Sequence, residues 1–478
     1  MRIFMLGWEF PPFIAGGLGT ACYGLTKAID RLGHEVLFVL PKPVDPSYSS
    51  HVQLRSPSSL RELKRITREV VESETLPLEA ARVEAAIEAE RRAEFERAVF
   101  HAIPSNFSSP YPTFEGLKLP EGVSQTTVTE LIIRAERGDA AAAKALESLG
   151  VRRRTLSEEI EEIGEIAPGS AHYGSDLYGD AHRYARLAGV LARREDFDVI
   201  HAHDWLTYPA GMAVKAITGK PLVVHVHATE FDRSGEHVNR GVYDIERAGM
   251  HAADKVIAVS MLTKNICERR YGVPADKIEV VYNGVDQDSR QPVAAQQIGA
   301  KDKIVLFLGR ITMQKGPEYF IAAAKRVLEK VENVKFVVAG SGDLALRMIE
   351  QAAQLGIGAK VLFTGFLRGK DVERVFQMAD CYVMPSVSEP FGIAALEAMH
   401  NETPVIISKT SGVAEVLQHA LKVDFWDIDE MANKIVAVLK YAPLSKTLRE
   451  HGAFEVRDLT WDGAAQRCLQ IYRAAAAK

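Results

Sequence analysis

The 478-residue sequence predicts an α/β protein of two domains, each built on a parallel sheet. Short apolar runs alternate with amphipathic stretches of helical period, which is typical of parallel strands joined by crossover helices. The alternation stops near residue 285 and restarts after residue 300. A chain of this length is also too long for a single core. We therefore expect an N-terminal domain over residues 1–285 and a C-terminal domain over 286–459, facing each other across a cleft.

Each domain has its own series of apolar runs, which predict its strands. Those of the first are RIFMLGW (2–8), EVLFVLP (35–41), DVIHAH (198–203), PLVVHVH (221–227) and KVIAVS (255–260). Those of the second are KIVLFLGR (303–310), VKFVVAGS (334–341), KVLFTGF (360–366), CYVMPS (381–386) and PVIISK (404–409). The polar stretch between the two series, residues 283–303, is predicted to be a linker.

Residues 51–165 break the alternation and are rich in Glu, Arg and Ala. This composition predicts a helical insertion in the first domain, with a looser stretch over 104–116. A solvated charged surface, a lid, an acceptor platform and a homo-oligomer contact all fit such a segment, and the sequence leaves these alternatives open.

Composition excludes several classes of partner. Lys and Arg number 58 and Asp and Glu 63, so a net charge of −5 gives no general attraction to nucleic acid or anionic membranes. The four cysteines form no C-x-x-C pair, which favours free thiols in a reducing compartment. The N-terminus does not resemble a signal peptide, and no apolar run approaches the roughly 20 residues that span a bilayer. We expect a cytoplasmic protein without a transmembrane segment.

A glycine-rich turn, IAGGLG (14–19), joins the first strand to the first helix. Glycines let the backbone approach a ligand, and the N–H groups that open a helix attract anions. The turn fits an anion or sugar site, or only a tight connection. It is not G-x-G-x-x-G in frame, which weighs against a dinucleotide-binding dehydrogenase.

Two cations follow the first strand of the second domain, where open α/β sheets bind ligands. Arg310 and Lys315 lie five residues apart in FLGRITMQKG (307–316), and such a pair suits a diphosphate. Cations placed there would stabilise a diphosphate leaving group as its charge develops. The alternative is a pair of solvated surface charges.

The segment CYVMPSVSEPFGIAALEAM (381–399) combines two carboxylates with a helix start. A strand ends near Met384, Glu389 lies on the following loop, and a helix opens near Gly392 and carries Glu397. The N–H groups at this helix start can bind phosphate oxygens, while the two carboxylates can accept hydrogen bonds from sugar and ribose hydroxyls. The alternative is that both glutamates are simply exposed charges.

Histidines cluster near the ends of two first-domain strands, at His203, His225 and His227, with Asp204 beside them. Metal binding, structural burial and polar contacts to a sugar are all open for them. Because side chains alternate along a strand, His225 and His227 share a face, whereas His203 and Asp204 do not easily bind one ion.

As a set, SEPFGIAALEAM, GRITMQKG, VVYNGVD and AGSGD resemble the GT-B glycosyltransferases of family four and the related glycogen and starch synthases. HAHDW and WEFPPFIAGGLG are most similar to the glycogen synthase branch. The resemblance covers residues 1–45, about 170–285 and 303–475. It implies two Rossmann-like domains, with the donor mainly in the second, the acceptor mainly in the first, and a last helix over about 460–478 that packs back on the first.

The resemblance also assigns roles to five side chains. It implies that Arg310 and Lys315 hold the donor diphosphate. Glu389 would bind hydroxyls of the donor sugar and Glu397 those of the ribose. His227 would contact the sugar across from the leaving group.

Backbone contacts are implied at four further positions. The Gly392 and Ile393 amides would meet phosphate, the Gly17 amide would lie beside the diphosphate or sugar, and Gly365 would lie beside the base. Ile14 departs from the pattern, because glycogen synthases that use ADP-glucose usually carry a lysine there. This leaves UDP-glucose, ADP-glucose or another donor open.

The activity implied is that of a retaining glucosyltransferase that moves glucose from UDP- or ADP-glucose onto an α-glucan or a small glycosyl acceptor. The leaving phosphate would help to take the acceptor proton. No cofactor is expected: there is no lysine context for pyridoxal phosphate, and neither D-x-D string (286–288, 427–429) ends an apolar strand, so we predict no metal. Alternatives are a family-four transferase with another sugar or a small-molecule acceptor, an epimerase or phosphorylase, and a non-catalytic glucan-binding scaffold.

Overall fold

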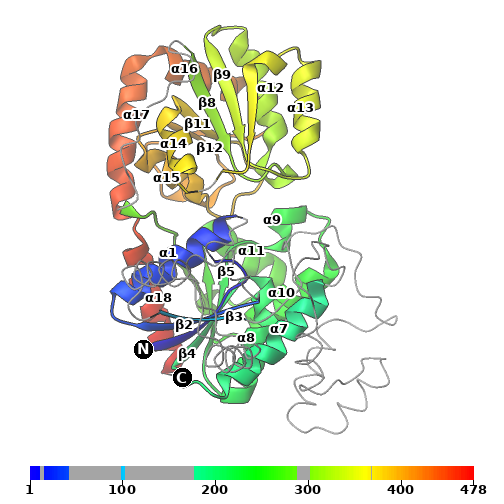
Figure 1. Ribbon diagram of the computed structural model, residues 1–478, viewed down its shortest axis with the longest axis vertical. Coiled ribbons are helices and arrows are strands. Elements are labelled where there is room, and N and C mark those ends of the chain that lie inside the picture. Colours follow the sequence, from blue (N-terminus) through cyan, green and yellow to red (C-terminus); the bar gives the residue numbers. More distant parts are fainter. Residues whose placement is uncertain (11–15, 42–97, 103–176, 288–301, 368, 478) are drawn as a thin grey trace, which may run out of the picture.

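The computed structural model describes residues 1–10, 16–41, 98–102, 177–287, 302–367 and 369–477. They form two parallel sheets, one above the other in Figure 1. The first sheet has seven strands in the order β3-β2-β1-β4-β5-β6-β7, and the second has six in the order β10-β9-β8-β11-β12-β13. All of the strand pairs are parallel. The prediction of two parallel α/β sheets is therefore confirmed.

The first sheet is built from strands separated by helices that cover its two faces. Its strands are β1 (Arg2–Leu6), β2 (Glu35–Leu40), β3 (Ala98–Ala102), β4 (Val199–His203), β5 (Leu222–Val226), β6 (Lys255–Ala258) and β7 (Ile278–Val280). Its helices are α1 (Gly17–Arg31), α7 (Leu177–Ala192), α8 (Tyr208–Thr218), α9 (Glu230–Ser234), α10 (Arg240–Ala252) and α11 (Met261–Tyr271). Short 3₁₀ turns are η1 (Trp205–Thr207) and η2 (Ala275–Lys277).

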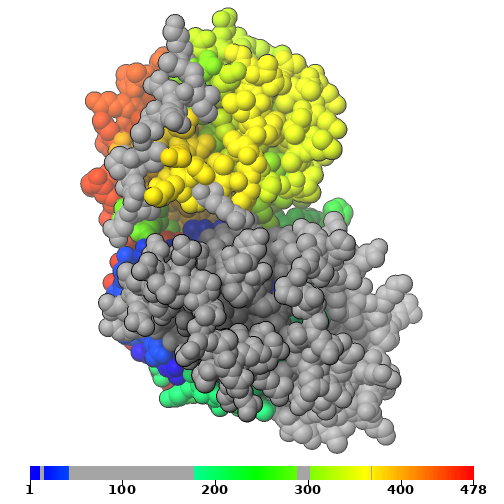
Figure 2. Space-filling model, in the orientation of Figure 1, coloured from blue at the N-terminus to red at the C-terminus, as the bar shows by residue number. Residues whose placement is uncertain are grey.

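The second sheet follows the same plan. Its strands are β8 (Lys303–Leu308), β9 (Val334–Ala339), β10 (Val361–Gly365), β11 (Cys381–Met384), β12 (Val405–Ser408) and β13 (Leu421–Val423). Its helices are α12 (Pro317–Leu328), α13 (Ala345–Gln354), α14 (Lys370–Met378), α15 (Ile393–His400), α16 (Ile428–Lys440) and α17 (Ala442–Glu455). The 3₁₀ turns are η4 (Met313–Lys315), η5 (Gly358–Lys360), η6 (Gly412–Glu415) and η7 (Val456–Asp458). Figure 2 shows much of this domain as a rounded body in green to orange.

Both faces of each sheet are buried, which explains why its strands are continuous apolar runs. Along β1, Phe4 and Leu6 belong to one apolar cluster, while Ile3 and Met5 belong to another on the opposite face. The second sheet likewise separates two clusters. This double burial holds the strand ends rigid, and the loops that follow them carry the candidate site.

The last helix, α18 (Trp461–Ala476), returns to the first domain and packs against α1. It crosses beside the first sheet below the long α17, as the red and orange segments of Figure 1 show. Gly24 of α1 lies under Trp461, and a Cβ at Gly24 would stand 2.3 Å from the indole ring. Only glycine therefore fits at this crossing.

One secondary-structure prediction is wrong. Residues 98–102, AVFHA, were expected within a helical insertion, but they form β3 and pair with β2 along its length. The hydrogen bonds of a neighbouring strand outweigh the helical preference of the Glu- and Ala-rich sequence before it. The rest of the predicted insertion (51–97 and 103–165), Ile14, and residues 288–301 of the linker lie outside the described residues. Among the described helices, none is long and apolar enough to cross a membrane.

Candidate functional site

The loops that follow β8 and β11 in the second domain meet the first domain at two places. The hydroxyl of Ser388, after β11, donates a 2.6 Å hydrogen bond to Oδ1 of Asp232 on α9. On the other side, Gly16 at the start of α1 lies so close that a Cβ there would be 3.8 Å from Nε of Arg310. The glycine-rich turn and the predicted phosphate cation therefore face each other across the domain boundary.

A third contact between the two domains involves a carboxylate and a helix start. The carboxylate of Glu415, on η6, accepts hydrogen bonds of 2.9 and 2.7 Å from the backbone N–H groups of Met261 and Leu262. These groups open helix α11, where an anion is favoured by the helix dipole. A charge of the second domain thus caps a helix of the first.

Lys315 and Glu389, which are 74 residues apart in the sequence, form an ion pair in the structure. Their Nζ and Oε2 atoms lie 2.5 Å apart, and Ser386 donates a further hydrogen bond of 3.1 Å to the same oxygen. The Glu389 side chain is 8% exposed and that of Lys315 20%, so the cation lies nearer to solvent. The two predicted site residues are therefore brought together.

Local sequence explains why this pair forms. Lys315 ends η4, and the next residue, Gly316, has a φ of +63° and lies against Pro385, whose oxygen a Cβ would meet at 2.2 Å. Glycine therefore permits η4 to approach the loop after β11. The backbone of Glu389 is held as well, because its N–H donates to Thr410 and its oxygen accepts from the Gly412 N–H.

Helix α15 starts immediately after this loop. Gly392 precedes it with a φ of +113°, and a Cβ there would lie 2.9 Å from Cε of Met384. The first helical residue is Ile393, so the N–H groups at this end are positioned to bind an anion. Glu397, one turn further along, is partly buried; burial, with a smaller contribution from the Glu373 charge, raises its pKa to about 7.

Gly365 lies apart from this group. It ends β10, an outer strand of the second sheet, which is separated from β11 by β9 and β8. Three strand spacings correspond to roughly 14 Å. Gly365 has a φ of +73° and is exposed, with open space around its Cα.

The first-domain wall of the site carries four histidines whose rings lie close together. His201 and His203 on β4 share a face with His225 and His227, because His203 pairs in register with His225. Their ring centroids lie 4.1 to 5.3 Å apart. Burial lowers the pKa of all four and brings those of His201 and His227 to about 3, so the rings are neutral at pH 7.

Two hydrogen bonds order this histidine cluster. Nδ1 of His203 lies 2.9 Å from Nε2 of His227, and Nδ1 of His201 lies 2.7 Å from the Tyr472 hydroxyl on α18. His201 was not among the predicted site residues, although its i, i+2 spacing from His203 places both side chains on one face.

The histidine cluster is also the group of described residues that could hold a metal ion. Nitrogen atoms of His201, His203 and His225 lie within 4.8 Å of one another. Nε2 of each has no hydrogen-bond partner among the described residues. Neutral imidazoles are common metal ligands. The absence of a metal therefore stays a prediction.

Asp204 has a structural role that was not predicted from the sequence. Its backbone has a φ of 60° and a ψ of 169°, a conformation that costs energy for a residue with a Cβ. Its Oδ1 accepts the N–H groups of His227 at 2.7 Å and of Ala228 at 3.3 Å. Burial raises the pKa of Asp204 to about 7. Asp204 thus fixes the backbone that presents His227.

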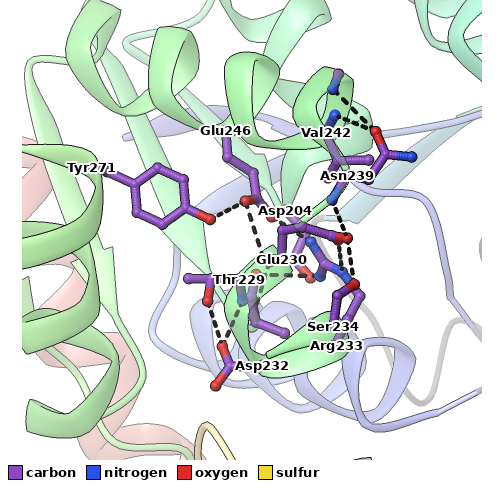
Figure 3. Close-up of polar contacts among 12 residues, drawn as sticks. Asp204, Thr229, Glu230, Asp232, Arg233, Ser234, Asn239, Val242, Glu246 and Tyr271 are labelled. Carbon is purple, nitrogen blue, oxygen red and sulfur yellow. Dashed lines mark hydrogen bonds and ion pairs between the residues drawn. The ribbon is translucent and has the colours of Figure 1, made fainter. Parts of the chain in front are cut away.

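A buried polar network follows His227 and supports α9 (Figure 3). Arg233 forms ion pairs with Glu230 and Glu246. The hydroxyl of Tyr271 also donates to Glu246. No local signal in the sequence identified this network, because TEFDRSGEH has the polar composition of an ordinary loop.

Comparisons with known proteins agree along most of the chain. Residues 289–453 match the family model for "Glycosyl transferases group 1", residues 142–289 that for "Glycosyltransferase Family 4", and residues 2–107 that for the "Starch synthase catalytic domain". An uncharacterized glycosyltransferase of Methanocaldococcus jannaschii is 34% identical over 62% of this chain and 80% of its own.

Other relatives have named activities. The glycogen synthase of Mycobacterium tuberculosis is 26% identical over 99% of this chain and 95% of its own. The alpha-maltose-1-phosphate synthase of Mycolicibacterium smegmatis is 30% identical over 60% of this chain and 82% of its own.

Solved structures share the fold. Sucrose-phosphate synthase from Thermosynechococcus elongatus superposes with a TM-score of 0.67 at 18% identity, covering 100% of this chain and 99% of its own. Anabaena HepE in complex with UDP and glucose superposes with a TM-score of 0.63 at 16% sequence identity, covering 99% of this chain and 100% of its own.

Proposed function

The chain belongs to the glycosyltransferases of group 1 and family 4, and from this premise we propose that it is a retaining glucosyltransferase. It would move a glucosyl unit from UDP- or ADP-glucose to an acceptor, in the manner of a glycogen synthase that extends an α-glucan. The observation that carries the proposal is the Lys315–Glu389 pair, which lies beside the N-terminus of α15.

The donor diphosphate would lie between Arg310, Lys315 and the N–H groups of Gly392 and Ile393. Charged hydrogen bonds and a helix N-terminus are the usual means of holding phosphate. These groups are fixed before the reaction, so they stabilise the charge that develops on the leaving group. Gly17, next to the glycine that approaches Arg310, would supply an amide from the first domain.

The nucleoside would extend along the second sheet. Glu397 is proposed to accept hydrogen bonds from the ribose hydroxyls, and Gly365 to lie beside the base. The rough separation between β11 and β10 suits an extended nucleotide, and the exposed surface at Gly365 leaves space for a flat ring. The donor base stays open between uracil and adenine.

The donor sugar would lie between Glu389 and His227. Glu389 accepts hydrogen bonds from its hydroxyls, while His227 contacts the opposite side as a neutral ring. A pKa of about 3 makes His227 a poor general base at pH 7. We therefore propose that a phosphate oxygen of the leaving nucleoside diphosphate takes the acceptor proton. The acceptor oxygen bonds to the anomeric carbon as the bond to phosphate breaks.

We propose that transfer requires neither a metal nor pyridoxal phosphate, because Arg310 and Lys315 supply the positive charge. We also propose a cytoplasmic location, since the four cysteines are free and buried, which suits a reducing compartment. A second candidate is transfer to a small phosphorylated acceptor. Relatives named mannosylfructose-phosphate synthase and D-inositol 3-phosphate glycosyltransferase favour it.

The test is a panel of UDP-, ADP- and GDP-sugars, each with and without a glucan or a sugar phosphate. Nucleotide release only when an acceptor is present supports a transferase, and the productive acceptor separates the two candidates. An isomerised sugar without nucleotide release would indicate an epimerase. Donor or glucan binding without turnover would indicate a non-catalytic scaffold.

A further inference from the structure

Helix α9 is the first-domain element that meets both second-domain segments carrying the proposed catalytic pair. It contacts η4, which ends at Lys315, and through Asp232 it contacts Ser388, the residue before Glu389. It also begins three residues after His227. One short helix therefore lies at the junction of the proposed phosphate, sugar and acceptor contacts.

Asp232 makes this junction with its two carboxylate oxygens. Its Oδ2 accepts hydrogen bonds of 2.7 Å from the backbone N–H and from the hydroxyl of Thr229. Its Oδ1 accepts the 2.6 Å hydrogen bond from Ser388. The side chain is buried, so these bonds are shielded from water and stronger than at a surface. A single carboxylate thus ties the backbone after His227 to the loop before Glu389.

The support beneath Asp232 is rigid. Arg233, the next residue, is held between the carboxylates of Glu230 and Glu246, and Tyr271 anchors Glu246 from α11 (Figure 3). The hydroxyl of Ser234 donates to Glu230 as well. These contacts all lie within the first domain, so they hold α9 in place whether or not the second domain is docked on it.

We propose that Asp232 is a positioning residue that couples domain closure to catalysis, an inference that rests on the proposed transferase function. When the domains close, Asp232 accepts the Ser388 hydroxyl and fixes Glu389 at one distance from His227. The donor sugar is then held from both sides in the geometry of the reaction. Because small displacements of such contacts lower the rate strongly, the effect falls mainly on kcat.

Ser388→Ala is the decisive variant, because it removes the interdomain hydrogen bond and leaves the Thr229–Asp232 cap intact. A hydrogen bond to a charged group contributes enough for roughly a tenfold effect on rate. We expect kcat to fall by about that factor, with KM for the nucleotide sugar changed less than about twofold. Nucleotide release by hydrolysis should rise relative to transfer, and Ser388→Thr should restore the rate.

Asp232→Ala and the Asp232→Ala/Ser388→Ala double variant test whether the two residues act as one. We expect the double variant to be no slower than Asp232→Ala alone. The matched control is Asp371→Asn on α14, an exposed carboxylate paired with Arg374, which should leave kcat unchanged. Normal kcat in Ser388→Ala, or independent effects of the two substitutions, would overturn the proposal.

Hydrogen exchange tests the coupling without turnover. In Ser388→Ala with bound UDP, amide exchange should accelerate at residues 386–389 of the second domain, while residues 227–229 should stay protected, because their N–H groups donate to Asp204 and Asp232 within the first domain. Unchanged exchange at 386–389 would overturn the inference even if the wild type transferred no sugar. A wild type that shows the coupling but transfers nothing would instead count against the proposed function alone.

Discussion

The two walls of the candidate site, one from each domain, differ in charge and in exposure to solvent. The second-domain wall carries charge near solvent: Lys315 is 20% exposed and stands beside a helix N-terminus. In the first-domain wall, the histidine cluster is polar but neutral and closed, since His203 is 0% exposed and every ring of the cluster has a lowered pKa. A wall with fixed charges suits a diphosphate, whereas a neutral wall suits hydroxyl groups.

The largest expected effect comes from substitutions in the second-domain wall, which carries the charges. Lys315→Ala or Glu389→Ala should lower kcat by roughly a thousandfold or more, because each removes a group that acts on the transition state. Lys315→Ala also leaves the buried Glu389 carboxylate without its cation, so thermal unfolding should be measured beside initial rates. Lys330→Ala, in the turn after α12, is the exposed control, and near-normal rates for both site variants would refute the site assignment.

A smaller effect is expected on the neutral wall. His227→Ala should lower kcat/KM by about a hundredfold, the loss of one well-placed contact to the sugar. Because the pKa of His227 is about 3, the pH profile between 6 and 8 should keep its shape in this variant. The control is His237→Ala, an exposed histidine nearby. A loss of rate at low pH that disappears with His227 would show that the ring acts as a general base.

Most of the charged wall and three of the four clustered histidines could be predicted from the sequence, whereas the contact between the two domains could not. Lys315 and Glu389 follow apolar strands, and the carboxyl ends of parallel strands meet at one edge of a sheet, so their proximity follows from strand order. Asp232 and Ser388 are 156 residues apart in polar loops, where no periodicity marks a partner. His201 could have been found, because it alternates with His203 along an apolar strand.

The elements of the fold also differ in how well the sequence predicts them. Buried parallel strands leave a local signal because both of their faces are apolar, and this predicted the two sheets. The strand at residues 98–102 was missed because its neighbours are charged and helix-favouring, while its stabilising partner, β2, lies about 60 residues earlier in the sequence. Local composition therefore predicts an element poorly when its pairing is distant.

Glu397 allows a pH test of the charged wall, with an expected effect smaller than that of His227→Ala. With a pKa of about 7 in place of 4.5, it is mostly protonated at pH 6 and ionised at pH 8. If the carboxylate binds ribose hydroxyls, kcat/KM for the donor should rise roughly tenfold between these pH values. A nucleotide sugar has no group that titrates there. Because the folded state holds this proton up to a higher pH, the same shift makes the fold less stable as pH rises from 4.5 through 7.

Two variants decide whether Glu397 is responsible for that rise. Glu397→Gln should give a flat profile, since its side chain no longer ionises. Glu450→Gln on α17, an exposed carboxylate, should keep the rise. A rise that persists in Glu397→Gln would assign the titration to another group and leave the ribose contact without support.

The smallest expected effect tests whether the histidine cluster is free of a metal ion, and therefore neutral, in the active protein. If Arg310 and Lys315 supply the positive charge, removing metal ions with a chelator should leave the transfer rate unchanged. Nε2 atoms of His201, His203 and His225 have no hydrogen-bond partner in the part of the chain that the structure describes, and the spacing of the three rings would accommodate a transition metal. A chelator-sensitive rate that Zn²⁺ restores in the wild type but not in His225→Gln would place a metal in the histidine cluster. The histidine cluster would then carry charge as well. In that case two charged surfaces, one on each domain, would act on one donor.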